Sequence, residues 1–127
     1  MKFLITLIII FLNIFTMAFG DSVESISPAI AHKMHQDQQA ILVDVREEDE
    51  IKLGTIEKSL HLPMSLMSSN RTLFNEKVSK TLNKEKTIIL FCRSGRRSGI
   101  VANELKKDGF KVLNLGSFEN WIKSGLK

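Results

Sequence analysis

Seven consecutive residues, 92–98, combine one thiol, three guanidinium groups and two hydroxyls. The thiol belongs to Cys92, the only cysteine in the chain, so an internal disulfide is excluded. Cationic neighbours lower the pKa of a cysteine from its free value of about 8.5 and favour the thiolate, which is the nucleophilic form. Arg93, Arg96 and Arg97 supply three such cations. The segment therefore predicts a cysteine nucleophile that acts near an anionic ligand.

The segments on either side of this thiol predict a strand before it and a helix after it. The β-branched apolar run at 87–91 is typical of a buried strand, and the apolar spacing at 100–105 is typical of a helix, which we expect to begin near Ser98. Free N–H groups and a partial positive charge at a helix start favour an anion. Gly95 lets the intervening turn curl so that its N–H groups face one centre, and Ser94 and Ser98 can donate further hydrogen bonds.

The rest of the chain alternates between helical and strand patterns and forms one continuous domain from about 21 to 127. Strands separated by helices predict right-handed crossovers and a mainly parallel sheet with helices on both faces, which is the α/β class. In such sheets ligands bind at the carboxyl ends of the strands, where Cys92 falls. The expected elements are a helix opened by Ser27 and Pro28, strands at 41–45 and 60–62, mostly helix over 64–82, the strand at 87–91, a helix ending at Asp108, a strand at 111–115 and a short helix capped by Ser117.

The first twenty residues differ from the rest of the chain. Lys2 precedes an uncharged run over 3–20, and small residues lie three and one positions before Asp21. This order is typical of a secretory signal peptide over 1–20 that is cleaved before Asp21. The alternative is a retained membrane anchor, because the run is near the length that spans a bilayer. Both outcomes export the domain, and we expect a periplasmic protein that contacts the membrane only through an uncleaved segment.

The charge and the histidines argue against two classes of ligand. The chain has a net charge of +4 but no long block of Lys or Arg, so we expect a solvated surface and no nucleic-acid partner. His32, His35 and His61 are too scattered to indicate a metal site or a Cys/His pair. We therefore expect no bound metal. We expect the chemistry to depend on the thiol.

Several groups of residues follow one another in a family pattern. They are Leu42-Val43-Asp44-Val45-Arg46-Glu47, Gly54-Thr55-Ile56, Leu62-Pro63, the loop 92–98, and Gly109-Phe110 through Leu115-Gly116 to Trp121. In order and spacing they resemble the rhodanese domain family, and most of all its small, one-domain, exported bacterial members. The resemblance implies a thiosulfate sulfurtransferase without a cofactor. The family's cysteine takes the outer sulfur of a small anionic donor such as thiosulfate, holds it as a persulfide, and passes it to a thiophilic acceptor such as cyanide or a thiol, which can belong to a protein.

The resemblance also implies a role for each matching residue. Cys92 is the nucleophile, the N–H groups of residues 93–97 cradle the transferred sulfur, and Arg93 and Arg97 orient the donor. Asp44 and Arg46 form a structural ion pair, since a buried carboxylate needs a partner. The implied set is Cys92 as the catalytic residue, Arg93, Ser94, Gly95, Arg96 and Arg97 as substrate-binding residues, and Asp44, Arg46 and Ser98 as structural support.

Some positions depart from the family pattern. Thr55 stands where many members have histidine, Lys58 and Ser59 replace a common Gly-Ala, and Ser117 replaces a glycine. None of these positions lies in the loop 92–98. These departures leave the identity of the sulfur donor undecided, but they do not affect the assignment of Cys92 as the nucleophile.

Two alternative functions fit part of the pattern. Phosphatases and arsenate reductases of related fold have a cysteine, five residues and an arginine, but Ser98 stands where that arginine would be. A persulfide carrier without turnover, or a binding module, would have the same fold, and sequence does not separate carrier from enzyme because one persulfide serves both. The sulfurtransferase interpretation would fail if the thiol were packed away from solvent, inert toward electrophiles and unable to gain a second sulfur.

Overall fold

The computed structural model describes residues 22–127. The signal peptide expected at 1–20 lies outside the described residues. Within 22–127, none of the helices combines the length and hydrophobicity that crossing a membrane would require.

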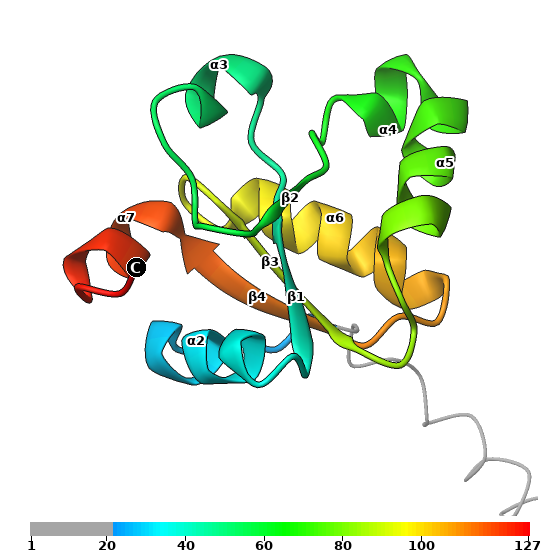
Figure 1. Cartoon of the computed structure of the whole chain (residues 1–127). Coiled ribbons are helices and arrows are strands. Elements are labelled where there is room, and N and C mark those ends of the chain that lie inside the picture. The colour runs from blue at the N-terminus through cyan, green and yellow to red at the C-terminus, as the bar shows by residue number, and fades with distance from the viewer. Residues whose placement is uncertain (1–21) are drawn as a thin grey trace, which may run out of the picture.

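One four-stranded sheet forms the centre of the molecule (Figure 1). Its strands are β1 (Ala40–Asp44), β2 (Leu60–His61), β3 (Thr87–Cys92) and β4 (Val112–Ser117). The strand order is β2-β1-β3-β4, and every neighbouring pair is parallel. The expected α/β class with a parallel sheet is confirmed, and the carboxyl ends of β1 and β3 lie side by side at one edge.

Helices cover both faces of this sheet. One face carries α2 (Pro28–Gln36) and α7 (Phe118–Lys123), and the other carries α4 (Leu66–Ser69), α5 (Arg71–Thr81) and α6 (Arg96–Lys107) (Figure 1). The short α3 (Glu48–Ile51) follows the carboxyl end of β1. The expected starts of α2 and α7 are confirmed, since the Ser27 and Ser117 side chains accept hydrogen bonds from the backbone of the first turn.

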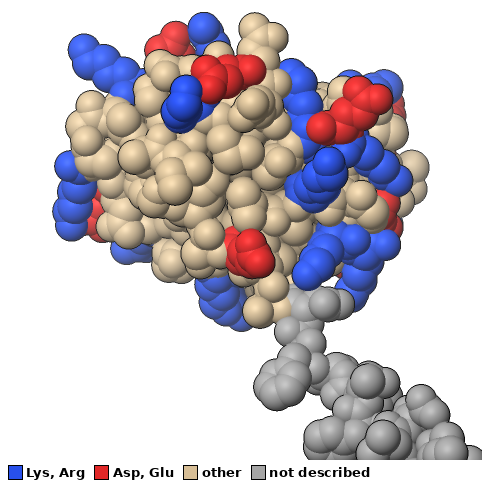
Figure 2. Space-filling view, turned by 90° about the horizontal axis from the view of Figure 1, so that it is seen from below, with Lys and Arg blue, Asp and Glu red and all other residues tan. Residues whose placement is uncertain are grey.

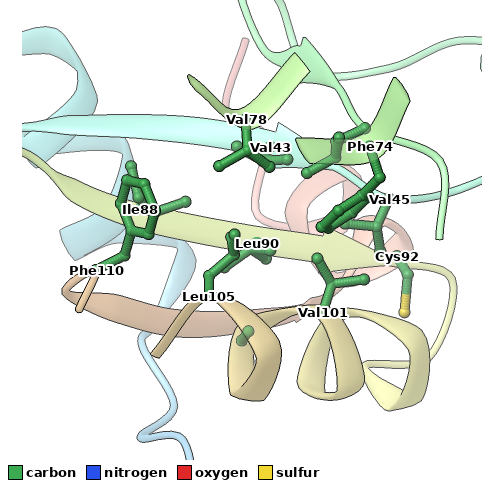
Figure 3. Packing of buried hydrophobic residues seen from close by; sticks show 12 residues of the cluster. Val43, Val45, Phe74, Val78, Ile88, Leu90, Cys92, Val101, Leu105 and Phe110 are labelled. Carbon is green, nitrogen blue, oxygen red and sulfur yellow. The ribbon is translucent and has the colours of Figure 1, made fainter. Parts of the chain in front are cut away.

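The core is divided between the two faces by the alternation along β3. Ile88, Leu90 and Cys92 belong to the cluster that includes residues of α5 and α6 (Figure 3). Ile89 and Phe91 belong to the cluster on the opposite face, which includes residues of α2 and α7. All five are fully buried, which explains why the sequence of this strand is a continuous apolar run. Because Cys92 is the last residue of the strand, its side chain lies where the core meets the loop before α6.

Two expected helices differ from the structure in their bounds. The helical stretch at 64–82 is broken at Asn70, which ends α4 and caps α5 by accepting a hydrogen bond from the Leu73 N–H at 3.0 Å. The helix after Cys92 begins at Arg96, two residues before Ser98, so Ser98 lies inside its first turn. The Ser98 side chain is fully buried there.

A short N-terminal segment extends the sheet beyond β4. Ser25 forms a parallel bridge with Asn114, and the Asn114 backbone accepts from the Ile26 N–H at 3.1 Å and donates to the Glu24 carbonyl at 2.8 Å. Side chains on the two sides of this segment, Val23 and Ile26, pack against the two core clusters. The segment therefore covers the outer edge of β4 at Asn114.

Surface charge is mixed on the face seen in Figure 2. Basic and acidic side chains lie mainly around a broad uncharged area, and the basic groups do not form a continuous stripe there (Figure 2). Interspersed charges of both signs are typical of a solvated surface.

Candidate active site

The carboxyl end of β3 and the first turn of α6 hold Cys92 between them. Its sulfur points toward that first turn (Figure 3). The Gly95 N–H donates to the sulfur at 3.0 Å, and the Ser98 hydroxyl lies 3.4 Å from it. The Cys92 side chain has no exposed surface. A single sulfur is thus enclosed by hydrogen-bond donors at the end of a parallel strand.

Gly95 gives the loop its shape. It is the residue before α6 and has φ 98°, a conformation that side chains disfavour. A Cβ at this position would lie 3.2 Å from the Cα of Gly116 in β4, closer than ordinary van der Waals contact. Glycine therefore lets the loop turn back so that its N–H faces the sulfur.

Opposing effects set the acidity of the thiol. Burial raises the pKa of Cys92, but hydrogen bonds from the Ser98 hydroxyl and from the N–H groups of Ser98, Gly95 and Ser94 lower it, and the net pKa lies below that of an ordinary thiol. The lowered pKa agrees in direction with the prediction from the sequence. Its leading contributors are hydrogen bonds rather than arginine charges.

The three arginines of the loop have different surroundings. Arg97 forms a bidentate ion pair with Glu50 of α3, with N–O distances of 2.6 and 2.8 Å. The hydrogen bond from Arg97 holds the pKa of the Glu50 carboxyl down to about 2, and the same bond raises the pKa of Arg97. Arg93 and Arg96 are exposed. The positive charge of Arg97 at the helix start is therefore balanced by a carboxylate of the protein itself.

Asp44 and Arg46 form the expected ion pair at the end of β1. Both are buried, and Arg46 donates to the Asp44 carboxylate through its backbone N–H, Nε and Nη2, at 2.7–3.2 Å. Arg46 Nη2 also donates to the Gly54 carbonyl at 2.7 Å, and its guanidinium lies over the Phe118 ring. Thr55, which departs from the family pattern, donates to Asp44 at 2.6 Å. The pair joins the end of β1 to the loop before β2 and to α7.

Asn114 of β4 contacts the loop through its side chain. Its Oδ1 accepts from the Ser98 hydroxyl at 2.8 Å and from the Gly116 N–H at 2.9 Å, and its Nδ2 donates to the Gly95 carbonyl at 3.0 Å. Sequence reasoning missed both Asn114 and Glu50. The only signals were a polar residue within an otherwise apolar strand pattern and an acidic residue within a charged stretch.

A family model described as the rhodanese-like domain matches residues 27–124. The chain belongs to the rhodanese-like domain family. The match spans every strand and helix from α2 to α7, and it includes the whole loop around Cys92.

Named relatives and a solved structure are similar to this rhodanese-like domain. It is 38% identical over 92 residues to a mitochondrial protein of Schizosaccharomyces pombe, provisionally assigned as a thiosulfate sulfurtransferase; the match covers 68% of this chain and 63% of that protein. It is 29% identical over 100 residues to a thiosulfate sulfurtransferase of Coxiella burnetii, over 77% of this chain and 86% of the relative. A rhodanese-related protein of Thermoplasma volcanium superposes with a TM-score of 0.66 at 25% identity, over 82% of this chain and 95% of that one.

The rhodanese-like domain also has a hollow beside the loop. Its volume is about 310 Å³, and its lining is Arg46, Arg93, Phe118, Glu119 and Ile122. No group of three or more His, Cys, Asp or Glu side chains within 22–127 is arranged to hold a metal ion.

Proposed function

We propose that this rhodanese-like domain is a sulfurtransferase that carries sulfur as a persulfide on Cys92. The observation that carries the proposal is the ring of donors around one sulfur, with the Gly95 N–H at 3.0 Å and the Ser98 hydroxyl at 3.4 Å. Donors in this arrangement stabilise a thiolate before transfer and the anionic sulfur of a persulfide after it. The names of the relatives support the same chemistry.

The reaction has two nucleophilic displacements at sulfur, and we propose thiosulfate as the donor. The Cys92 thiolate attacks the outer sulfur of thiosulfate, a new S–S bond forms, and the old S–S bond breaks so that sulfite leaves with the electron pair. A thiophilic acceptor then attacks the outer sulfur of the persulfide. The bond to Cys92 breaks, the thiolate is regenerated, and the product is thiocyanate from cyanide or a persulfide from a thiol.

Arg93 is the better candidate than Arg97 for attracting the anionic donor. Both nitrogens at the tip of Arg97 already bind Glu50, whereas Arg93 is exposed and lines the hollow beside the loop. Because the sulfur has no exposed surface, the donor reaches it only after the residues that cover it move.

Mass spectrometry of the protein after treatment with thiosulfate tests the proposal. We expect the wild type to gain one sulfur atom, and Cys92→Ser to gain none. The wild type should then release thiocyanate from cyanide over many turnovers. Ser79→Ala, which changes an exposed hydroxyl on α5, is the matched control and should behave as the wild type.

The other outcomes each identify a different function. Persulfide formation only from a partner protein, without turnover on small donors, would indicate a carrier. Hydrolysis of an aryl phosphate that depends on Cys92 would indicate a phosphatase. A Cys92 that resists electrophiles and gains no sulfur would refute both the enzyme and the carrier.

We also propose that the domain is exported and acts in the periplasm after cleavage before Asp21. The support is the order of charged, apolar and small residues over 1–20. Expression in a bacterial host followed by N-terminal sequencing of the periplasmic fraction tests it. A chain that stays in the cytoplasm with Met1 intact would contradict the proposal.

A further inference from the structure

Asn114 hydrogen-bonds two of the residues whose donors surround the Cys92 sulfur, Gly95 and Ser98. Asn114 faces α6 because it pairs with Leu90, on the same side of the sheet, just before a bulge that skips one residue of β4. Its Nδ2 donates to the carbonyl of Gly95, and its Oδ1 accepts from the hydroxyl of Ser98. Asn114 therefore acts on the sulfur through Gly95 and Ser98, to which it is hydrogen-bonded.

The orientation of the Asn114 amide is determined by its backbone partners. The Gly116 N–H can only donate, so it requires the amide oxygen, and the Gly95 carbonyl can only accept, so it requires the amide nitrogen. Turning the amide over would place donor against donor and acceptor against acceptor. The Ser98 hydroxyl therefore meets an oxygen, to which it can only donate.

Ser98 has one O–H proton and two neighbours that can accept it. The Asn114 Oδ1 lies at 2.8 Å and the Cys92 sulfur at 3.4 Å. Ser98 has no exposed surface, so bulk water does not supply a second donor at this point. The Ser98 hydroxyl therefore donates to one acceptor at a time.

The protonation state of Cys92 determines which acceptor receives the hydrogen bond from the Ser98 hydroxyl. A neutral thiol can donate its own proton to the Ser98 oxygen, while Ser98 donates to Asn114, and all three groups are then satisfied. A thiolate has no proton to donate and accepts hydrogen bonds more strongly than a thiol, so the Ser98 hydroxyl can turn toward it and add to the bond from the Gly95 N–H. Asn114 Oδ1 then still accepts from the Gly116 N–H at 2.9 Å.

We propose that Asn114 is a positioning residue that competes with the Cys92 sulfur for the Ser98 hydroxyl proton. It holds the hydroxyl while the sulfur is neutral and releases it when the sulfur becomes an anion. The thiol proton leaves to the buffer, the Ser98 proton stays on its own oxygen, and nothing is oxidised or reduced. The inference deepens the proposed function, because the anion it concerns is the nucleophile of sulfur transfer.

Other charged groups near Cys92 act on every variant alike. Arg93, Arg96 and the Arg97–Glu50 pair lie on the loop, α6 and α3, Glu47 lies near Arg97, the Asp44–Arg46 pair lies at the end of β1, and Glu119 of α7 lies near Arg93. No hydrogen bond joins any of these side chains to the side chain of Ser98 or Asn114 in the described part of the chain. Their contribution therefore cancels when variants at these two positions are compared.

The test measures the pKa of Cys92 with and without Ser98→Ala in three backgrounds. The thiolate is followed by its ultraviolet absorbance against pH, which is clean here because the chain has one cysteine and no tyrosine. The backgrounds are the wild type, Asn114→Leu, which removes the competing acceptor, and Asn114→Asp, which keeps an acceptor. Asn120→Leu, a change of an exposed amide on α7, is the matched control and should match the wild type.

Ser98→Ala removes a donor to the thiolate and should raise the pKa of Cys92 in every background. The rise should be largest with Asn114→Leu, intermediate in the wild type and smallest with Asn114→Asp, with steps of roughly half a pH unit, as expected for a fraction of one hydrogen bond. The order does not depend on what Asn114 does to Gly95, because that effect is common to both members of each pair.

Equal rises in the wild type and Asn114→Leu, or a smaller rise with Asn114→Leu, would overturn the inference. If Asn114→Leu does not fold, a rise with Asn114→Asp at least as large as in the wild type overturns it. Absorbance requires no sulfur transfer, so the two proposals fail separately. The predicted order in a protein that gains no sulfur would support the role of Asn114 and refute the sulfurtransferase.

Discussion

At the scale of single residues, Cys92 combines two features that oppose each other. Its side chain is fully buried, which by itself raises the pKa of a thiol, yet donors from the loop and α6 lower the pKa below the ordinary value. Burial removes the hydrogen bonds that a thiolate would form with water. The loop replaces them with donors that lie within a few residues of Cys92 in the sequence.

The first prediction concerns the reactivity of Cys92 against pH. Because its pKa is lowered, alkylation by iodoacetamide should reach half of its maximal rate below about 8.5, the value of a free cysteine. The urea-unfolded protein provides the reference and should titrate at the free value. A folded protein that titrates at or above the unfolded one would contradict the hydrogen-bond argument.

The second prediction concerns Gly95. Gly95→Ala forces a side chain into a positive φ and against the Gly116 backbone at 3.2 Å, so we expect a loss of about 1–3 kcal/mol in the free energy of unfolding. Displacement of the Gly95 N–H from the sulfur should also slow sulfur transfer about tenfold, as expected for the loss of one hydrogen bond of about 1.4 kcal/mol.

Gly125→Ala is the control for that change. Gly125 also has a positive φ, 74°, but a Cβ there would meet no atom within 4 Å. It should lower stability without slowing sulfur transfer. Equal transfer rates for the two alanine variants would show that the close approach to Gly116 has no part in the reaction.

At the scale of elements, the ion pair between Glu50 and Arg97 joins α3 to the first turn of α6. The side chains are 28% and 22% exposed, so the pair is only partly screened by solvent. Its position explains how an arginine is tolerated at a helix start, where the macrodipole disfavours a cation. A carboxylate from another element thus balances Arg97, whereas the sequence had predicted a bound anionic ligand near the three arginines.

The third prediction concerns the pH dependence of this ion pair. The pKa of Glu50 is about 2 in the folded chain and near 4.5 when unfolded, so its contribution is fully present above pH 4.5 and is lost as the pH falls toward 2. Glu50→Gln should therefore lower the free energy of unfolding by about 1 kcal/mol at pH 7 and by nearly nothing at pH 2.

Denaturant unfolding at several pH values measures this difference. Asp49→Asn, on the same helix but exposed, is the control and should change stability little at any pH. A Glu50→Gln effect that stays constant down to pH 2 would show that the loss comes from packing rather than from charge.

At the scale of the whole molecule, the segment before α2 completes the sheet. It pairs with Asn114 through two backbone hydrogen bonds and contributes Val23 and Ile26 to the packing of the two cores. Without it, the backbone N–H and carbonyl of Asn114 would be unpaired at the outer edge of β4. The segment thus supports the strand that carries Asn114 to the loop.

The fourth prediction concerns this segment. A chain that begins at Ser27 should be less stable than one that begins at Ser22 by about 2–4 kcal/mol, from two backbone hydrogen bonds and two partly buried apolar side chains. Thermal unfolding of the two chains measures the difference. Equal midpoints would show that the edge of β4 needs no cover.

The sequence by itself was sufficient for features that depend on neighbouring residues. The apolar run before Cys92 and the helical spacing after the loop predicted a strand, a turn and a helix, because these patterns reflect local backbone geometry. The alternation of strands and helices predicted the parallel sheet, because parallel strands require crossover connections. The family resemblance implied the Asp44–Arg46 ion pair, whose two residues are only two positions apart in the sequence.

Only the tertiary structure showed which distant residues meet at the loop. Glu50 and Arg97 are 47 positions apart, and Ser98 and Asn114 are 16 apart, so no local pattern joins them. The burial of Cys92 was likewise decided by helices that cover the sheet. Local preferences determine where elements form, but contacts between elements depend on how the chain packs, and these contacts set the charge of Arg97's surroundings and the partner of the Ser98 hydroxyl.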